Sequence, residues 1–346
     1  MAMSAGKLWG FRRLADDTGR FKMTAVDQRP PIINLIKEKR GVAEADFAEI
    51  CDFKAALVGA LAPMSSAVLL DPYYAYPAAV GHVRPSQGLL LTLEDSQFEE
   101  VAGGRRTHAI ADWSVEKIRR LGADGVKLLA WYRPDAAPEI VEHQQRFVES
   151  VGQACRAHDI CFLLELLVYP LPGESGQTQD YIEHAAKRPQ LVIDSMKDFA
   201  DPKYGVDIYK LESPVAADNL VKPGAEGSDE IQAWFDALGK ACPRPWVMLS
   251  AGAGQDVFRH ILTYAYRAGA SGFLAGRAIW WQAGQHFPDM DRMNRALMEN
   301  AVPYMRELNA LTYAAATPWH DHPCFPDGVE LADAGPGFNS TYGGIG

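Results

Sequence analysis

Eight short apolar runs recur along the chain, and longer amphipathic segments separate most of them. Runs of this length are typical of buried β-strands, whereas apolar residues at helical spacing indicate helices that pack on a sheet. The runs cover residues 21–26, 67–70, 88–93, 125–131, 160–168, 206–211, 246–249 and 272–275. A strand that alternates with a helix eight times predicts an α/β fold, the parallel (β/α)8 or TIM barrel.

A doubly wound open sheet is the structural alternative. The count of eight runs and the lack of a nucleotide-binding glycine fingerprint both favour the barrel. Helical spacing occurs in residues 45–61, 114–121, 138–158, 229–242 and 255–268. We also expect a short N-terminal helix over 7–14 that covers the bottom of the barrel and a final helix over 290–312. The prediction is a single barrel domain over residues 1–320 and a Pro/Gly-rich tail over 321–346.

Composition excludes several classes of protein. The formal net charge is -10 and the Lys and Arg residues are scattered, which argues against a nucleic-acid partner. No segment approaches the ~20 apolar residues that a membrane-spanning helix needs, and residues 1–13 lack the apolar core of a signal peptide. The 5 cysteines contain no C-x-x-C pair, so we interpret them as reduced intracellular thiols. We expect a cytoplasmic enzyme or binding protein.

Polar residues lie at the predicted carboxyl ends of the strands, where barrels of this kind carry their chemistry. Lys127, Glu165 and Lys210 lie inside runs so apolar that their charges are costly unless they pair with one another. The other strand-end residues, in chain order, are Asp27, Gln28, Arg29, Asp71, Glu94, Asp95, Glu212, Ser250, Gly252, Gly276 and Arg277.

Lys210 is the candidate nucleophile. Ile208, Lys210 and Glu212 share one face of the sixth strand, and if that face looks inward Lys210 can meet Lys127 and Glu165. Burial and a second ammonium group are expected to lower the pKa of Lys210 from its reference of about 10.4. Burial is expected to raise the pKa of Glu165 towards a value useful in proton transfer. An amine beside an acid/base group is what Schiff-base chemistry requires.

The ends of the seventh and eighth strands predict an anion site. Small residues at Ser250, Gly252 and Gly276 let backbone N–H groups approach an oxyanion, and Arg277 adds a fixed positive fork. Barrels commonly bind phosphate between these two loops. The combination therefore indicates a phosphorylated ligand.

Each of these residues also has a purely structural interpretation. A single strand lysine is more often a surface or edge residue, Glu165 or Lys127 alone could be an ion-pair partner, and Asp27 could cap a helix. What favours a site is that the candidates all fall at the strand ends. His320 and His322 could clip a metal, but such a pair in a Pro/Gly-rich tail is more typical of a solvated segment.

The motifs at the strand ends resemble those of the class I tagatose 1,6-bisphosphate aldolases. The similarity runs from about Gly6 to Trp319, in the same order and with compatible spacing. The segments that carry it are VDQR at 26–29, LLDP at 69–72, ADGVK at 123–127, FLLE at 162–165, YKLESPV at 209–215, LSAG at 249–252 and GRA at 276–278.

The resemblance implies a role for each residue of the central group. Lys210 would form a Schiff base with the ketose carbonyl, and Glu165 would shuttle protons during its formation. Lys127 would orient substrate hydroxyls and depress the pKa of the nucleophile, with Asp27 and Gln28 positioning the bound chain. No cofactor or metal is implied.

The resemblance also implies a substrate. Ser250, Gly252, Gly276 and Arg277 would hold the phosphate of the dihydroxyacetone phosphate half. The expected reaction cleaves a phosphorylated ketose, such as tagatose 1,6-bisphosphate, to dihydroxyacetone phosphate and glyceraldehyde 3-phosphate. Its partners are thus small sugar phosphates.

Departures from the family pattern concern the far half of the substrate. Arg29 is followed by Pro30 and Pro31 where the family continues into a small-residue turn, and the loop over 169–174 also differs. The same family includes aldolases of sulfo-sugar phosphates, which release dihydroxyacetone phosphate and sulfolactaldehyde, and this alternative stays open. The anion at that end could be recognised by Arg29, Arg133 or Lys222.

Two rivals from other functional classes also stay open. A metal-dependent barrel lyase could use the oxygen ligands of Asp27, Asp71, Glu165 and Glu212. A non-catalytic sugar-phosphate sensor could use the same pocket without turnover. Apolar surface helices, including the Trp280–Trp281 region, would suit a homo-oligomer.

Overall fold

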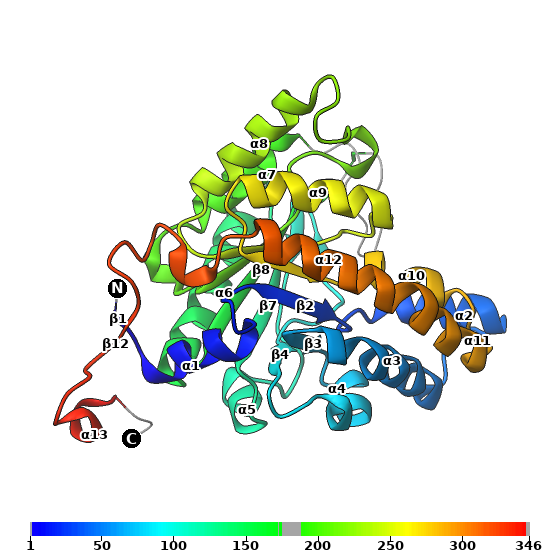
Figure 1. The fold of residues 1–346 in the computed structure, drawn as a ribbon, viewed down its shortest axis with the longest axis horizontal. Helices are drawn as coiled ribbons and strands as arrows, with labels where there is room; N and C mark the ends of the chain where they lie inside the picture. The colour runs from blue at the N-terminus through cyan, green and yellow to red at the C-terminus, as the bar shows by residue number, and fades with distance from the viewer. Residues whose placement is uncertain (1, 172, 175–187, 344–346) are drawn as a thin grey trace.

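A closed barrel of eight parallel strands forms the centre of the computed structural model, which describes residues 2–171, 173–174 and 188–343 (Figure 1). The strands are β2 (Phe21–Ala25), β3 (Ala67–Leu70), β4 (Gly88–Thr92), β7 (Gly125–Trp131), β8 (Cys161–Leu167), β9 (Ile208–Leu211), β10 (Trp246–Met248) and β11 (Gly272–Ala275). Chain neighbours are barrel neighbours, and β11 pairs with β2 to close the ring. The predicted (β/α)8 barrel is confirmed, and each strand lies within its predicted run.

Helices surround the barrel (Figure 1). They are α1 (Ala5–Leu14), α2 (Pro30–Arg40), α3 (Phe47–Leu61), α4 (Ala75–Ala79), α5 (Val115–Arg120), α6 (Pro138–Ala157), α7 (Pro189–Asp198), α8 (Ser228–Ala241), α9 (Gln255–Arg267), α10 (Arg277–Gly284), α11 (Met290–Ala296) and α12 (Val302–Ala315). The short helix α13 (Phe338–Thr341) lies on the C-terminal tail, away from the barrel (Figure 1). The predicted final helix is two helices, α11 and α12, joined by a wider π-helical turn.

The predicted helices do not include α2, although Pro30 and Pro31 were identified as a departure from the family pattern. Both prolines lie in the first turn of α2. A proline there costs little, since the first N–H groups of a helix have no intrahelical partner. The departure after the first strand is therefore a helix start.

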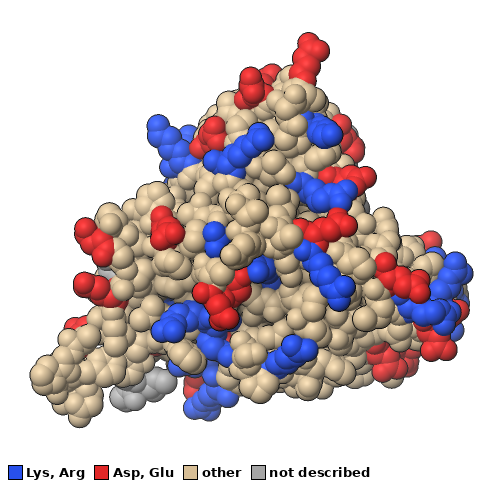
Figure 2. Space-filling view, in the orientation of Figure 1, with Lys and Arg blue, Asp and Glu red and all other residues tan. Residues whose placement is uncertain are grey.

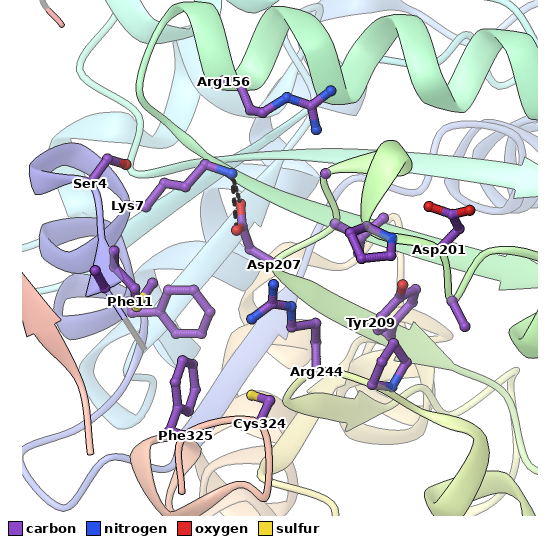
Figure 3. A pocket seen from close by; sticks show the side chains of 17 residues that line it. Ser4, Lys7, Phe11, Arg156, Asp201, Asp207, Tyr209, Arg244, Cys324 and Phe325 are labelled. Carbon is purple, nitrogen blue, oxygen red and sulfur yellow. Dashed lines mark hydrogen bonds and ion pairs between the residues drawn. The ribbon is translucent and has the colours of Figure 1, made fainter. Parts of the chain in front are cut away.

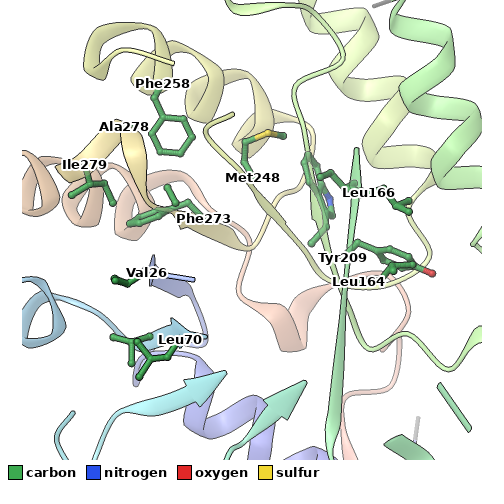
Figure 4. Packing of buried hydrophobic residues seen from close by; sticks show 14 of the residues in the cluster. Val26, Leu70, Leu164, Leu166, Tyr209, Met248, Phe258, Phe273, Ala278 and Ile279 are labelled. Carbon is green, nitrogen blue, oxygen red and sulfur yellow. The ribbon is translucent and has the colours of Figure 1, made fainter. Parts of the chain in front are cut away.

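Two hydrophobic cores follow from the alternation of side chains along each strand. Met23, Leu69, Leu163, Ile208 and Leu274 point inward and fill the lower barrel. Outward side chains pack against the surrounding helices; among them are Leu70, Leu164, Tyr209, Met248 and Phe273 (Figure 4). Phe11 and Leu14 of α1 join the inner core, so the N-terminal helix covers the bottom of the barrel as predicted.

Both ends of the described chain lie below the barrel, where β1 (Ala2–Met3) pairs with β12 (Glu330–Leu331). A cavity of about 600 Å³ lies beside these strands. The ion pair between Lys7 and Asp207, 2.7 Å apart, and the side chains of Arg156 and Arg244 line it (Figure 3). Asp207 precedes β9, so this cavity lies at the amino-terminal end of the strands. Barrels of this kind carry their chemistry at the opposite end.

Charges of both signs are interspersed on the surface. The face in Figure 2 shows Lys and Arg side chains mixed with Asp and Glu, without a basic stripe. This pattern agrees with the scatter expected from the sequence. Within the described ranges, no helix has the length and apolar character needed to cross a membrane.

Candidate active site

The register of the barrel brings Glu165 and Lys210 together at the carboxyl end of the strands. Strands β8 and β9 pair so that these two residues lie directly side by side. Leu163 and Ile208, two positions earlier on the same strands, belong to the inner core. Residues two apart point the same way, so Glu165 and Lys210 also point into the barrel. The face of β9 that carries Lys210 therefore looks into the barrel.

Glu165 contacts two lysines through one oxygen. Its Oε2 atom lies 3.0 Å from Lys210 Nζ and 2.9 Å from Lys127 Nζ. Lys127 Nζ also lies 3.0 Å from Asp27 Oδ2 and 2.5 Å from Glu94 Oε1. All five side chains are buried. We call Asp27, Glu94, Lys127, Glu165 and Lys210 the charge network.

The network keeps Lys127 protonated. Burial lowers the pKa of Lys127, but the charges of Asp27, Glu165 and Glu94 outweigh burial and raise that pKa above its ordinary value. Lys127 is therefore a permanent ammonium group beside Glu165.

The Asp27 carboxylate is held in its charged form. Burial acts to raise the pKa of Asp27, but Lys127 and Lys210 outweigh it and lower the pKa to about 2. Two ammonium groups on one oxygen likewise favour the carboxylate of Glu165. Burial alone, from which a raised pKa of Glu165 was expected, favours the protonated form.

The structure also decides two points that the sequence left open. Asp27 does not cap α2, whose N-cap is Arg29; its carboxylate instead binds Lys127. Glu94 was noted at a strand end but was not among the candidates, although it binds Lys127 and accepts a hydrogen bond from Leu129 N at 3.1 Å. The buried Lys127 could have indicated this role of Glu94, because a buried ammonium group needs several hydrogen-bond acceptors.

Two small hollows flank Lys210. One, of about 40 Å³, is lined by Asp27, Gln28, Arg29, Glu94, Lys127 and Lys210, among others. The other, of about 20 Å³, is lined by Gln28, Glu165, Lys210, Ser250, Gly276 and Arg277, among others. Every predicted site residue except Gly252 therefore lines a hollow.

Gly252 contributes through its neighbour. A Cβ atom on Gly252 would lie 3.3 Å from Arg277 Nη1, so the two residues pack together. Ala251 and Gly252 both have positive φ, at 47° and 88°, and Ala253 N donates to Ser250 O at 2.7 Å to close the turn. This tight turn places Ser250 beside Arg277.

The last strand end packs closely against the first. A Cβ atom on Gly276 would lie 2.6 Å from Ala25 O and 2.8 Å from Gln28 Nε2, so a larger residue would push these strands apart. Arg277 begins α10, and the N-terminus of a helix favours anions. Ser250, Gly252, Gly276 and Arg277 thus form a compact cradle on one side of Lys210.

Of the three cations considered for the far end of a substrate, only Arg29 faces the hollows. Arg29 Nη2 donates to Glu94 O at 3.0 Å, while its Nε and Nη1 atoms are buried without a hydrogen-bond partner within the described ranges. Arg133 is engaged by Asp135 and Glu174, at 2.7 and 3.1 Å. Lys222 is exposed and lines neither hollow. Pro172, in the loop that differs from the family, lies outside the described residues.

The four carboxylates of the metal-dependent alternative do not converge. Asp27 and Glu165 bind lysines of the charge network. Asp71 pairs with Lys54, and Glu212 Oε1 accepts a hydrogen bond from Val168 N at 2.7 Å. In the part of the chain that the structure describes, no three His, Cys, Asp or Glu side chains gather as a metal site would require.

The side chains of His320 and His322 lie in different surroundings. His322 is buried, and burial, then the charge of Arg244, lower its pKa to about 4. Its Nδ1 atom accepts a hydrogen bond from Cys324 N at 3.2 Å. His320 lies 3.9 Å from Asp321 and is largely exposed. This pair is therefore part of the packing of the tail.

Comparison with known proteins adds the family. Residues 23–282 match the model of the DeoC/LacD family aldolases. Tagatose 1,6-diphosphate aldolase 1 of Streptococcus mutans is 31% identical over 332 residues, which cover 93% of this chain and 100% of that protein. Tagatose 1,6-diphosphate aldolase of Listeria monocytogenes is 33% identical over 327 residues, which cover 92% of this chain and 94% of that protein.

Solved structures share the fold at lower identity. An archaeal fructose-1,6-bisphosphate aldolase, with its catalytic lysine covalently bound to the carbinolamine intermediate of its substrate, has a TM-score of 0.57 at 17% identity, covering 89% of this chain and 99% of that chain. Fructose-bisphosphate aldolase from Plasmodium falciparum has a TM-score of 0.65 at 10% identity, and the match covers 92% of this chain and 98% of that chain. At these identities the likeness supports the barrel alone.

The ionisation of Asp27 makes a prediction about acid stability. Its pKa is about 2 in the folded protein against 3.8 as the ordinary value, so the unfolded chain binds more protons between these pH values. Asp27 therefore contributes roughly 2 kcal/mol that is present above about pH 4 and is lost as the pH falls through about 2. Asp27→Asn should show a shallower loss of unfolding free energy between pH 5 and 2.5, measured by urea denaturation.

A matched control separates this effect from general acid sensitivity. Asp17 is exposed, so Asp17→Asn should follow the unmodified protein over the same range. If Asp27→Asn keeps the full acid slope, the lysines do not stabilise the Asp27 carboxylate in the way the geometry indicates.

Proposed function

This chain belongs to the DeoC/LacD family of aldolases, and we propose that it is a class I aldolase that cleaves a phosphorylated ketose through a Schiff base on Lys210. The observation that carries the proposal is the buried contact of 3.0 Å between Lys210 Nζ and Glu165 Oε2 at the carboxyl end of the barrel. Lys210 is the nitrogen nucleophile, and Glu165 is the group that takes and returns its proton.

The first half of the reaction forms the imine. Transfer of one proton from Lys210 to Glu165 along their contact leaves a free amine. The amine adds to the ketose carbonyl. One proton then moves from the nitrogen to the carbonyl oxygen, which gives a neutral carbinolamine. Glu165 then returns its proton to the carbinolamine hydroxyl, which leaves as water. The products are a protonated imine on Lys210 and the Glu165 carboxylate.

Lys127 affects the proton transfer between Lys210 and Glu165. Because it remains protonated 2.9 Å from the same Glu165 oxygen, it stabilises the carboxylate that is restored when Glu165 returns its proton. Asp27 and Glu94 hold Lys127 in place and balance its charge.

The second half of the reaction breaks a carbon–carbon bond. The protonated imine withdraws electrons from the adjacent bond, and loss of the proton from the neighbouring hydroxyl releases the aldehyde. The electrons of the broken bond form an enamine on Lys210. Its protonation and hydrolysis release dihydroxyacetone phosphate and restore the amine.

The phosphate of the dihydroxyacetone phosphate half belongs in the cradle of Ser250, Gly252, Gly276 and Arg277. Three of these residues line the same hollow as Lys210 and Glu165. A guanidinium group beside a helix N-terminus is a suitable partner for a phosphate dianion. This end of the substrate would then be fixed before the carbonyl meets Lys210.

Arg29 is the proposed cation for the far end of the substrate. Its buried Nε and Nη1 groups, which have no hydrogen-bond partner among the described residues, lie beside the other hollow, and an anion there would satisfy them. A ketose with an anion at both ends fits this arrangement, and the names of the relatives make tagatose 1,6-bisphosphate the first to test, with glyceraldehyde 3-phosphate as its aldehyde. A sulfonate at the far end, as in the sulfo-sugar alternative, would serve Arg29 equally well.

The expected cytoplasmic location and homo-oligomeric assembly belong to this proposal as well. Both follow from the sequence, and size-exclusion chromatography with light scattering would test the assembly directly.

Borohydride trapping tests the Schiff base. After incubation with dihydroxyacetone phosphate, reduction should attach the triose irreversibly to the peptide that carries Lys210, as detected by mass spectrometry. Lys210→Ala should give no adduct and no turnover, whereas Lys240→Ala, at an exposed lysine of α8, should behave like the unmodified protein.

The same experiment separates the rival functions. Activity that disappears on chelation, without a trapped adduct, would support the metal-dependent lyase. Binding of the sugar phosphate without an adduct or turnover would support the sensor. Turnover by Lys210→Ala would overturn the proposal.

Arg277→Ala tests the phosphate cradle. If Arg277 makes a buried, charge-assisted contact, its loss should reduce kcat/KM for a phosphorylated ketose by on the order of 2 to 5 kcal/mol in transition-state stabilisation. The matched substitution Arg267→Ala, at an exposed arginine of α9, should have little effect. An equal loss with a ketose that lacks the phosphate at this end would contradict the assignment.

A further inference from the structure

Lys54 is a charged residue in the middle of a buried helix face. It lies on α3, and its side chain is fully buried among the apolar residues Ile50, Phe53, Leu57 and Val58 of the same helix. Burial of an ammonium group is costly, and here burial lowers the pKa of Lys54. An apolar residue would fill this position at less cost, so the interactions of the ammonium group require an explanation.

Lys54 connects the ends of the first two barrel strands. Its Nζ atom donates to Val26 O at 2.9 Å and pairs closely with the carboxylate of Asp71, which is also fully buried. Asp71 follows β3, and its Oδ1 atom accepts hydrogen bonds from Tyr73 N and Tyr74 N at 3.0 and 2.8 Å. One ammonium group thus holds both the end of β2 and the turn after β3.

The residue after Val26 is Asp27 of the charge network. Val26 N donates to Leu69 O at 2.9 Å, which continues the pairing of β2 with β3, whereas its carbonyl oxygen turns outward to Lys54. The two bonds fix the orientation of the peptide that joins Val26 to Asp27. Asp27 then points inward and lies 3.0 Å from Lys127.

We propose that Lys54 is a positioning residue for catalysis, which sets the place of Asp27 and, through Lys127, the geometry of Glu165 and Lys210. It touches none of the reacting atoms. This inference rests on the proposed function of the charge network.

The simple variant Lys54→Met would leave the Asp71 carboxylate buried without its partner, and the protein could fail to fold. The double variant Lys54→Met/Asp71→Asn removes both charges and keeps an oxygen that can accept from Tyr73 N and Tyr74 N. The matched control is Val58→Ala, which removes buried apolar volume from the same helix and keeps the bond of Lys54 to Val26 O and its pair with Asp71. It should lower the melting temperature only.

The experiment compares both variants with the unmodified protein in kcat, KM, the pH profile of kcat and borohydride trapping with dihydroxyacetone phosphate. For the double variant we expect a folded protein that still forms the trapped adduct. Its kcat should fall roughly tenfold to a hundredfold, since small displacements of catalytic groups have effects of that size. KM should change far less, and the pH profile of kcat should shift because Asp27 has moved relative to Lys127.

A folded double variant with an unchanged kcat and pH profile would overturn the role of Lys54 and leave it a structural ion pair. A loss of kcat of the same size in Val58→Ala would overturn it too, because loss of stability alone would then explain the effect. If the unmodified protein forms no adduct, the proposed function fails, and that result is distinct from either outcome for Lys54.

Discussion

The ion pair that Glu165 makes with two lysines is the interaction on which the rest of the site depends. Three charged side chains inside a barrel mouth would be prohibitively costly if each were alone, but one carboxylate oxygen lies within 3.0 Å of both ammonium groups. Asp27 and Glu94 complete the balance around Lys127. A proton can therefore pass between Lys210 and Glu165 while Lys127 stays charged. That asymmetry between two neighbouring lysines is the chemical basis of the proposed aldolase.

Much of the barrel could be predicted from the sequence, because parallel strands buried on both faces form continuous apolar runs. Alternation along a strand also placed Ile208, Lys210 and Glu212 on one face, but only the structure shows that Lys210 points inward. Helix α2 was missed, although the first turn of a helix accepts its two prolines. The final helix was predicted as one because a π-helical turn leaves no clear mark on apolar spacing.

The partners of the central lysines were harder to predict. Glu94 lies at a strand end like many other carboxylates, and only the register of β4 against β7 shows that it reaches Lys127. Lys54 resembles an ordinary helix lysine in the sequence, because its partners, Val26 O and Asp71, come from two different strands. Conversely, the choice among Arg29, Arg133 and Lys222 needed the position of each side chain relative to Lys210. These partners come from segments far apart in the sequence, so local sequence patterns do not reveal them.

A crystal structure of the enzyme frozen after exposure to dihydroxyacetone phosphate tests the central claim most directly. The account predicts continuous electron density from Lys210 Nζ to the former carbonyl carbon, with Glu165 within hydrogen-bond reach of that nitrogen and the phosphate beside Arg277 and Ser250. Density for a free ligand whose carbonyl is bound elsewhere, with Lys210 still paired to Glu165 and unmodified, would contradict it.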